Sequence, residues 1–352
     1  MNVFVINPGS TSTKLACFAG ETVLWSATLN HNQEELDRFD RVVDQLDWRK
    51  QAVAEAFAAN GLPDRPLAAV AGRCGLLRPV AGGTYRVNDA MCRDLRSARY
   101  GEHPSNLGGL LARRFGKKLS VPAFVVDPPT VNEFEPASRL SGVPGIERKC
   151  RAHVLNVKAV ARCAAAELNK PLAETAFVVA HLGGGVSICA LHGGRIVDAT
   201  DALLGEGPFS LTRAGVLSLE AMLELCFDSG RSREEVARLL LRESGVQAYL
   251  GETWLPAVYE LARTNPEARQ VLDALVRQIA KWIGAMTAVL RGHPDAILLT
   301  GGMTHHQPLV EEVAGHVGAL APVRVYPGER EMSALAEGAI RVLTGEEQPL
   351  DY

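Results

Sequence analysis

The sequence has little excess charge and no long apolar run. It sets 37 lysines and arginines against 40 aspartates and glutamates, a formal net charge of −3. A chain so close to neutral has no electrostatic reason to take nucleic acid or an anionic membrane as its main partner. No apolar stretch approaches the ~20 residues that a transmembrane helix needs. We therefore expect no nucleic-acid partner and no membrane partner.

Cysteine is scarce and does not occur in metal-binding or disulfide patterns. The chain has seven cysteines in 352 residues, an odd number, and none forms a Cys-x-x-Cys pair. This spacing argues against a disulfide framework or a zinc site and fits a reducing compartment. The chain also begins without the basic region and apolar stretch of a secretion signal, so we expect a cytoplasmic protein. The cysteines are Cys17, Cys74, Cys92, Cys150, Cys163, Cys189 and Cys226.

A polar, glycine-containing stretch lies between two apolar runs near the start of the chain. Residues 3–6 and 15–18 are apolar, and between them stands Asn7-Pro8-Gly9-Ser10-Thr11-Ser12-Thr13-Lys14. This pattern predicts a β-hairpin whose tip offers backbone N–H groups, hydroxyls and one lysine. Such donors suit a phosphate. By itself the stretch is also compatible with an ordinary polar turn and a solvated lysine.

The same layout occurs a second time, about half a chain later. Residues 178–190 again place a Gly-rich turn, His181-Leu182-Gly183-Gly184-Gly185, between two β-type runs. Placing Gly9 on Gly183 gives an offset of 174 positions (183 − 9). The same offset places Gly20 on Gly194 (194 − 20), and a third β-type run follows in both copies. A repeat of this kind predicts two halves of one ancestral fold. Two donor-rich tips facing each other would hold a polyphosphate from both sides.

Strands alternate with helices through the rest of the chain, which predicts an α/β fold. Asp127 follows a buried-type strand, a common position for ligand-binding side chains in such sheets. The longest predicted helix, 268–290, carries an apolar stripe typical of a core helix. The other predicted helices are 33–46, 48–59, 88–99, one that follows the turn 100–109 and runs through Phe115, 153–168, 219–227, 233–242, 255–264, 308–320 and 331–343.

Four stretches of the chain resemble the butyrate kinases. They are the glycine turns at 7–14 and 181–185, the segment Gly205-Glu206-Gly207-Pro208-Phe209-Ser210, and the turn Thr300-Gly301-Gly302. The butyrate kinases belong with acetate and propionate kinase to the short-chain acyl kinases, in the actin, sugar kinase and heat-shock chaperone superfamily. The resemblance runs from residue 1 to about residue 346. It implies two duplicated actin-like (ribonuclease H-like) α/β domains with a central interdomain cleft. The first would span 1–152, with the C-terminal helix 330–352 packing back on it, and the second, nucleotide-binding domain would span 153–329.

The resemblance also implies which residues bind the nucleotide. Two phosphate loops and one turn against the adenosine would hold ATP. The residues that match them are Asn7, Ser10, Ser12 and Lys14 in the first loop, His181, Gly183, Gly184 and Gly185 in the second, and Gly301 and Gly302 in the turn.

The residues that match the catalytic positions are two arginines, a histidine and two acids. They are Arg73, Arg213, His153, Asp127 and Glu331, with Asp127 and Glu331 also expected at Mg²⁺. Arg73 would hold the acid substrate beside Leu76, Leu77 and His103. Taken without the resemblance, these arginines and acids are more typical of an ordinary solvated surface.

The expected activity is reversible transfer of a phosphoryl group from ATP to butyrate or a branched-chain fatty acid. Bidentate arginines suit both a carboxylate acceptor and a migrating phosphoryl group. Two alternatives remain open: an acetate or propionate kinase, and a non-enzymatic actin-like or chaperone-like nucleotide switch. The resemblance further implies a homodimer or a larger homo-oligomer.

Overall fold

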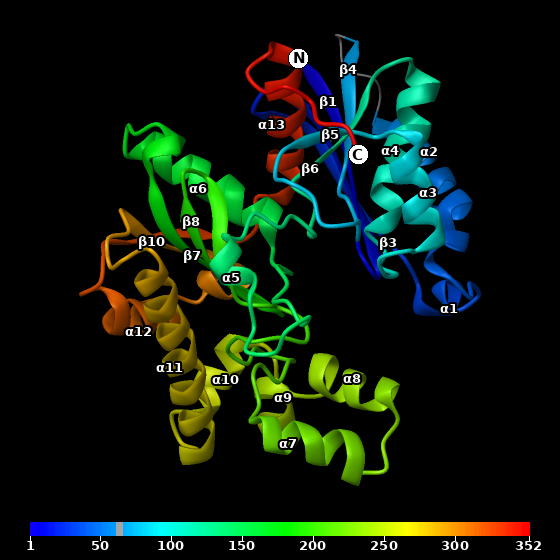
Figure 1. Ribbon diagram of the computed structural model, residues 1–352. Coiled ribbons are helices and arrows are strands. Elements are labelled where there is room, and N and C mark those ends of the chain that lie inside the picture. The colour runs from blue at the N-terminus through cyan, green and yellow to red at the C-terminus, as the bar shows by residue number, and fades with distance from the viewer. Residues whose placement is uncertain (61–65) are drawn as a thin grey trace. The chain divides into compact units, whose positions relative to one another are not determined.

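The computed structural model describes residues 1–60 and 66–352, which divide into two α/β units (Figure 1). The first unit consists of Met1–Asn132 and Arg330–Tyr352, and the second of Glu133–Glu329. The boundary expected from the sequence, after residue 152, lies later than the observed one. The reason is that Glu133, at the start of the second unit, forms a buried ion pair with Lys158. Across the described residues, every helix falls short of the length and apolarity that a bilayer crossing requires.

The sheet of the first unit combines a meander with parallel strands. Its six strands run in the order β3-β2-β1-β4-β6-β5. The first three form two antiparallel pairs, β4 and β6 run parallel to β1, and β5 closes the edge antiparallel to β6. The strands are β1 (Asn2–Pro8), β2 (Ser12–Ala19), β3 (Thr22–Asn30), β4 (Leu67–Gly72), β5 (Thr84–Arg86) and β6 (Ala123–Val126).

Helices cover both faces of this sheet. α4 packs on β1, β4 and β6, and its apolar residues share one core with Phe4, Ile6 and Val70. The last helix, α13 (Glu331–Thr344), also contacts β1, β4 and β6 but lies on the other side of the sheet from α2, α3 and α4 (Figure 1). Both faces of β1 are consequently buried. The remaining elements are α1 (Gln33–Leu36), η1 (Val42–Gln45), α2 (Leu46–Asn60), α3 (Asp89–Ser97) and α4 (Asn106–Leu119).

The second unit repeats the arrangement with five strands, in the order β9-β8-β7-β10-β11. The long helix α11 packs its predicted apolar stripe, Leu275, Ile279 and Ile283 among others, into the core of this unit. The strands are β7 (Ala176–Leu182), β8 (Val186–His192), β9 (Arg195–Ala199), β10 (Ala296–Gly301) and β11 (Val323–Pro327). The helices are α5 (Pro136–Arg139), α6 (Val154–Glu167), η2 (Leu172–Glu174), α7 (Leu219–Leu223), η3 (Glu224–Asp228), α8 (Arg233–Arg242), α9 (Gly245–Leu250), α10 (Leu255–Leu261), α11 (Pro266–Val289), η4 (Gly302–His305) and α12 (Gln307–Val317).

The strand register confirms the predicted duplication and corrects its alignment by one residue. Each meander has a bulge at the same place, between Cys17 and Phe18 and again between Ala190 and Leu191. The first hairpin closes at Pro8↔Thr13 and the second at Leu182↔Val186, so the second tip is one residue shorter. The offset is therefore 174 before the tips and 173 after them. As a result Gly20 (φ +61°) corresponds to Gly193 (φ +58°) and not to Gly194.

Glycines let the start of α4 approach the end of β4 closely. A Cβ on Gly108 would lie 2.0 Å from the carbonyl oxygen of Arg73, and one on Gly72 would lie 2.2 Å from the carbonyl oxygen of Gly108. No side chain fits at either position without moving backbone. This close contact fixes the turn that carries Arg73.

Gly108→Ala should lower the free energy of unfolding by about 1–3 kcal/mol, the usual cost of overpacking. Gly284 on α11 is a matched control, because a Cβ there meets no atom within 4 Å. Gly284→Ala should raise stability by about 1 kcal/mol, since alanine is the better helix former. Urea unfolding of both variants measures the difference. Equal midpoints for the two would contradict this account of the contact.

Candidate functional site

Three candidate residues lie at one edge of the first sheet. In the register of the parallel strands, Ile6 pairs with Gly72 and Gly72 pairs with Val125. Asn7 and Arg73 come directly after the first pair, and Asp127 follows on the third strand. Because neighbouring strands lie about 4.8 Å apart, this edge brings an amide, a guanidinium and a carboxylate close together.

Glu331 joins this group from the far end of the chain. One of its carboxylate oxygens accepts a hydrogen bond from Asn7 Nδ2 (3.0 Å) and forms an ion pair with Arg73 Nη1 (2.7 Å). The Glu331 side chain is only 7% exposed, while that of Arg73 is 28% exposed. Glu331 is also the first residue of α13, where the helix dipole favours a negative charge. The structure thus unites three expected site residues through one carboxylate oxygen.

Asp127 occupies a separate position with its own contacts. Its Oδ1 accepts from the Gly83 amide (2.8 Å), and its backbone N–H donates to the Gly83 carbonyl (2.9 Å). It is 1% exposed and has a left-handed backbone (φ +41°). Aspartate adopts this conformation more readily than most residues, and such positions are frequent at functional sites. Within residues 1–60 and 66–352, no three His, Cys, Asp or Glu side chains gather as a metal site.

The first tip, residues 9–12, presents its polar side chains outward. Ser10 is exposed and Ser12 half-buried, and the Gly9 N–H donates to the Ser12 carbonyl (2.7 Å). Lys14 is exposed on β2, directly opposite Asn7 in the antiparallel pair. The predicted phosphate-loop residues therefore surround one small region of the surface.

A buried histidine supports this tip from behind. His31 Nε2 lies 2.8 Å from Thr13 Oγ1, and its ring packs against Trp48 with the ring centroids 4.8 Å apart. Burial, and secondarily the positive charge of Arg49, lower the pKa of His31 from 6.5 to about 4. His31 is therefore neutral at pH 7.

The residues expected to surround the acid substrate are partly core residues. Leu77 is 1% exposed and belongs to the core of the first unit, whereas Leu76 is half-buried. Asn106 accepts a hydrogen bond from the Leu76 N–H (3.0 Å) and donates to the Gly101 carbonyl (2.9 Å). This amide brings Leu76 next to the exposed loop that carries His103.

Two histidines stack at the start of α6 in the second unit. The rings of His153 and His181 lie 3.8 Å apart with an interplanar angle of 6°. His153 Nδ1 lies 2.9 Å from Ser187 Oγ. The Asn156 amide is 3.0 Å from His181 Nδ1 and also donates to Thr300 (3.1 Å). Because His181 is completely buried, it supports the ring of His153 and does not present its own at the surface.

The second tip, residues 183–185, lies against Arg213. A Cβ on Gly185 would fall 2.1 Å from Arg213 Nη1, so any larger residue there would have to displace the guanidinium. The same nitrogen donates to the Ala202 carbonyl, and Ser210 Oγ donates to the Gly184 carbonyl (2.6 Å). Burial lowers the pKa of the Arg213 guanidinium, an effect that nearby Asp201 opposes.

A second arginine holds the segment that contacts Arg213. Arg151 Nε donates to Asp201 Oδ2 (2.8 Å), and the Arg151 carbonyl accepts from the Ala202 N–H (3.0 Å). Arg151 and Asp201 are not among the residues predicted from the sequence. The only sequence signal for them is their position beside His153 and the Gly205–Pro208 segment.

The turn expected to lie against adenosine follows β10. Gly301 has φ +94°, and a Cβ there would lie 2.3 Å from the carbonyl oxygen of Leu182. This close approach places the turn beside the end of β7 and beside His181, which pairs with Thr300. A Cβ on Gly302 would meet no atom within 4 Å.

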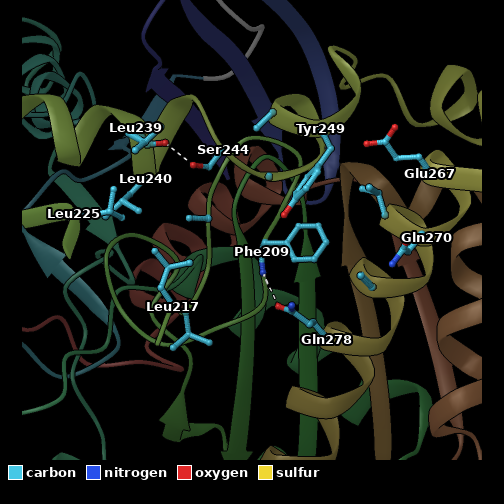
Figure 2. A pocket seen from close by; sticks show the side chains of 16 residues that line it. Phe209, Leu217, Leu225, Leu239, Leu240, Ser244, Tyr249, Glu267, Gln270 and Gln278 are labelled. Atoms are coloured by element: carbon cyan, nitrogen blue, oxygen red, sulfur yellow. Dashed lines mark hydrogen bonds between the residues drawn. The ribbon is translucent and has the colours of Figure 1, made fainter. Parts of the chain in front are cut away.

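A cavity of about 540 Å³ lies in the second unit. It is lined by parts of α8, α9 and α11 and by the segment around Phe209, whose N–H donates to Gln278 Oε1 (3.2 Å; Figure 2). No candidate site residue is among the described residues that line it. We therefore do not assign the acyl chain to this cavity.

Comparison with known proteins places these features in a family context. Residues 143–326 match the model of the acetokinase family. A probable butyrate kinase of Enterococcus faecalis (strain ATCC 700802 / V583) is 47% identical over 351 residues, which are 99% of this chain and 97% of that protein.

Solved structures of low sequence identity share the fold. The acetate kinase of Porphyromonas gingivalis superimposes with a TM-score of 0.79 at 18% identity, over 97% of this chain and 99% of that one. A propionate kinase of Francisella tularensis subsp. tularensis SCHU S4 superimposes with a TM-score of 0.75 at 17% identity, over 96% of this chain and 98% of that one. The actin-like fold expected for the duplicated α/β units is thereby confirmed.

The neutral His31 predicts a pH dependence of stability. Between pH 6.5 and 4 the unfolded chain binds a proton at His31 that the folded chain does not, so stability falls as pH falls. From pH 7 to 4.5, the free energy of unfolding of the wild type should fall by up to about 2 kcal/mol more than that of His31→Gln. Urea unfolding across this range measures it. The exposed His192 is the control: His192→Gln should follow the wild type. Parallel curves for wild type and His31→Gln would contradict the assignment.

Proposed function

Because the chain belongs to the acetokinase family, we propose that it is a butyrate kinase-like enzyme. It transfers the γ-phosphoryl group of ATP to the carboxylate of butyrate, or of a branched-chain acid of similar size. The products are the acyl phosphate and ADP, and the reaction is reversible. The enzyme would be cytoplasmic and would work as a homodimer or larger homo-oligomer, as the family resemblance implies.

One observation carries this proposal: each unit combines a glycine-containing hairpin tip with an arginine. Arg73 lies one strand from the first tip, and Arg213 lies against Gly185 of the second. Hairpin tips that present N–H groups suit phosphates, and arginine suits both carboxylates and phosphates. A carboxylate kinase needs donors of both kinds.

The acceptor needs no general base. A short-chain carboxylate has a pKa close to that of glutamate and is ionised at pH 7, so one of its oxygens can attack directly. Arg73 would hold this carboxylate. The ion pair with Glu331 uses Nη1 and leaves other guanidinium N–H groups for the substrate. Leu76 would contact the acyl chain, with Leu77 packed behind it.

The transfer itself depends on position and charge. A carboxylate oxygen forms a bond to the γ-phosphorus while the bond from that phosphorus to the bridging oxygen of ADP breaks. Arg213 and His153 would stabilise the negative charge on the transferred group. His181, stacked on His153 and bound by Asn156, would fix the orientation of that ring.

The nucleotide would be held by both hairpins. Ser10, Ser12, Lys14 and Asn7 would contact the phosphates from the first unit. The second tip, residues 183–185, would offer the N–H groups of Gly184 and Gly185 from the second unit, because the Gly183 N–H already donates to the Gly185 carbonyl (3.2 Å). Gly301 with Gly302 would form the turn against the adenosine. The positive φ of Gly301 supports a close approach of this turn's backbone to the adenosine.

The carboxylates of Asp127 and Glu331 fit Mg²⁺ by their chemistry. Both are hard oxygen donors, 1% and 5% exposed respectively, and Mg²⁺ commonly binds through one or two carboxylates together with substrate phosphates. When bound, the ion would neutralise charge on the ATP phosphates. Glu331 is additionally held in place by Asn7 and Arg73.

Arg213→Ala should lower kcat by about 100- to 1000-fold, comparable to the loss of one donor to transition-state charge. Trapping of the acyl phosphate with hydroxylamine measures the rate. Arg238→Ala is the control, because Arg238 is an exposed arginine of the same unit whose side chain is 60% exposed. It should retain wild-type kcat. An Arg213→Ala enzyme with more than half of wild-type kcat would contradict the role.

The acid preference tests the substrate assignment. Each methylene in an apolar pocket changes kcat/KM by about 10- to 200-fold, so butyrate should clearly exceed acetate. Acetate, propionate, butyrate, isobutyrate and valerate are compared under the same Mg²⁺ and ATP concentrations. A kcat/KM for acetate equal to that for butyrate would contradict the assignment and favour an acetate or propionate kinase. ATP hydrolysis without acyl phosphate from any acid would favour a nucleotide switch.

A further inference from the structure

Arg49 on α2 is a fully buried arginine beneath the first tip. Its exposed fraction is 0%. The guanidinium donates to the carbonyls of Gly9 (2.9 Å), Ser10 (3.0 Å) and Ser12 (3.2 Å) and to Thr13 Oγ1 (3.0 Å). Gln45 accepts the Nε–H (3.0 Å). One side chain thus contacts nearly every residue of the tip.

These hydrogen bonds hold the carbonyl groups of the tip toward the protein. Arg49 binds the carbonyls of Gly9, Ser10 and Ser12, and the carbonyl of Thr11 accepts from the His31 N–H (2.8 Å). All four tip carbonyls therefore point toward the protein.

The N–H groups of the same peptides must then point away from it. In a trans peptide the C=O and N–H bonds are antiparallel, and the described residues contain no cis peptide. With the Gly9 and Ser10 carbonyls turned inward, the N–H groups of Ser10 and Thr11 face outward. Within the described part of the chain, neither N–H has a protein acceptor. Both residues are exposed. Successive outward N–H groups of this kind form a binding site for anions.

The charge of Arg49 has no protein counterion in the described residues. All of its contacts there are to carbonyl, hydroxyl and amide oxygens. Burial lowers its pKa to about 10, so it is charged at pH 7. Such an uncompensated buried charge is costly to maintain. An anion bound at the tip would supply the missing negative charge.

We propose that Arg49 is a positioning residue for nucleotide binding: it orients the peptide groups of the first tip so that their N–H groups bind the phosphates of ATP. It does not contact the substrate itself. This inference rests on the proposed function for the identity of the anion, and it assigns to α2 a role that its sequence does not indicate.

The test measures nucleotide affinity directly, by titration calorimetry of the full chain with ADP and Mg²⁺. Arg49→Met, which keeps the bulk but removes the charge and donors, should weaken binding at least ten-fold. Arg49→Lys keeps the charge but loses the planar fork, and it should weaken binding three- to ten-fold. The KM for butyrate should change less than two-fold in Arg49→Lys, because the acid is held by Arg73.

Arg341→Met is the matched control for losing a largely buried arginine from the first unit. Its side chain is 13% exposed and pairs with Glu347, away from the tip. It should lower the melting temperature without changing the affinity for ADP. Wild-type affinity in both folded Arg49 variants, or equal loss of affinity in Arg341→Met, would overturn the proposal. If Arg49→Met does not fold, Arg49→Lys decides alone, and wild-type affinity in that variant overturns it.

The proposed function and this inference can fail separately. A wild-type chain that binds ADP but forms no acyl phosphate would contradict the kinase activity. The affinity of the Arg49 variants for ADP would still test the role of Arg49.

Discussion

The ion pair between Glu331 and Arg73 closes the first unit, because its two partners lie 258 positions apart in the chain. Glu331 begins α13, and α13 covers a face of the sheet that would otherwise expose β1, β4 and β6 to solvent. The six strands of this sheet therefore have both faces covered only when α13, from the end of the described chain, packs on them. Removing Arg73 would leave the buried carboxylate of Glu331 without its positive partner, which is costly. The same carboxylate also binds Asn7, so closing the fold and assembling this half of the candidate site depend on one contact.

The duplication gives each unit a hairpin, and the two hairpins are supported in different ways. Beneath the first, the buried guanidinium of Arg49 binds the inward carbonyls. In the second, shorter tip the carbonyl of Gly184 is bound by Ser210, and Arg213 lies against Gly185. The first arginine is thus fully buried behind its tip, whereas the second is half-buried and lies against its tip.

The parts of this structure that could be predicted are those encoded by local patterns. The two hairpins follow from apolar runs around glycine turns, and the core stripe of α11 follows from helical spacing. The resemblance to the butyrate kinases selected Arg73 and Arg213, which amino-acid type alone would assign to the surface. The buried position of Arg49 could not be predicted, because arginine is usually exposed and its partners are backbone atoms. The core position of Leu77 could not be predicted either, because nothing in the local sequence distinguishes Leu77 from Leu76.

The central claim is that a carboxylate oxygen accepts the phosphoryl group, and an isotope experiment tests it most directly. The enzyme is supplied with butyrate labelled with ¹⁸O in both carboxylate oxygens, together with Mg²⁺ and ATP, and the product is cleaved with hydroxylamine. Hydroxylamine attacks the acyl carbon, so the released phosphate retains the oxygen that bridged carbon and phosphorus. The account predicts phosphate carrying one ¹⁸O atom by mass spectrometry. Phosphate without ¹⁸O, formed as ATP is consumed, would show that water is the acceptor and would contradict the claim.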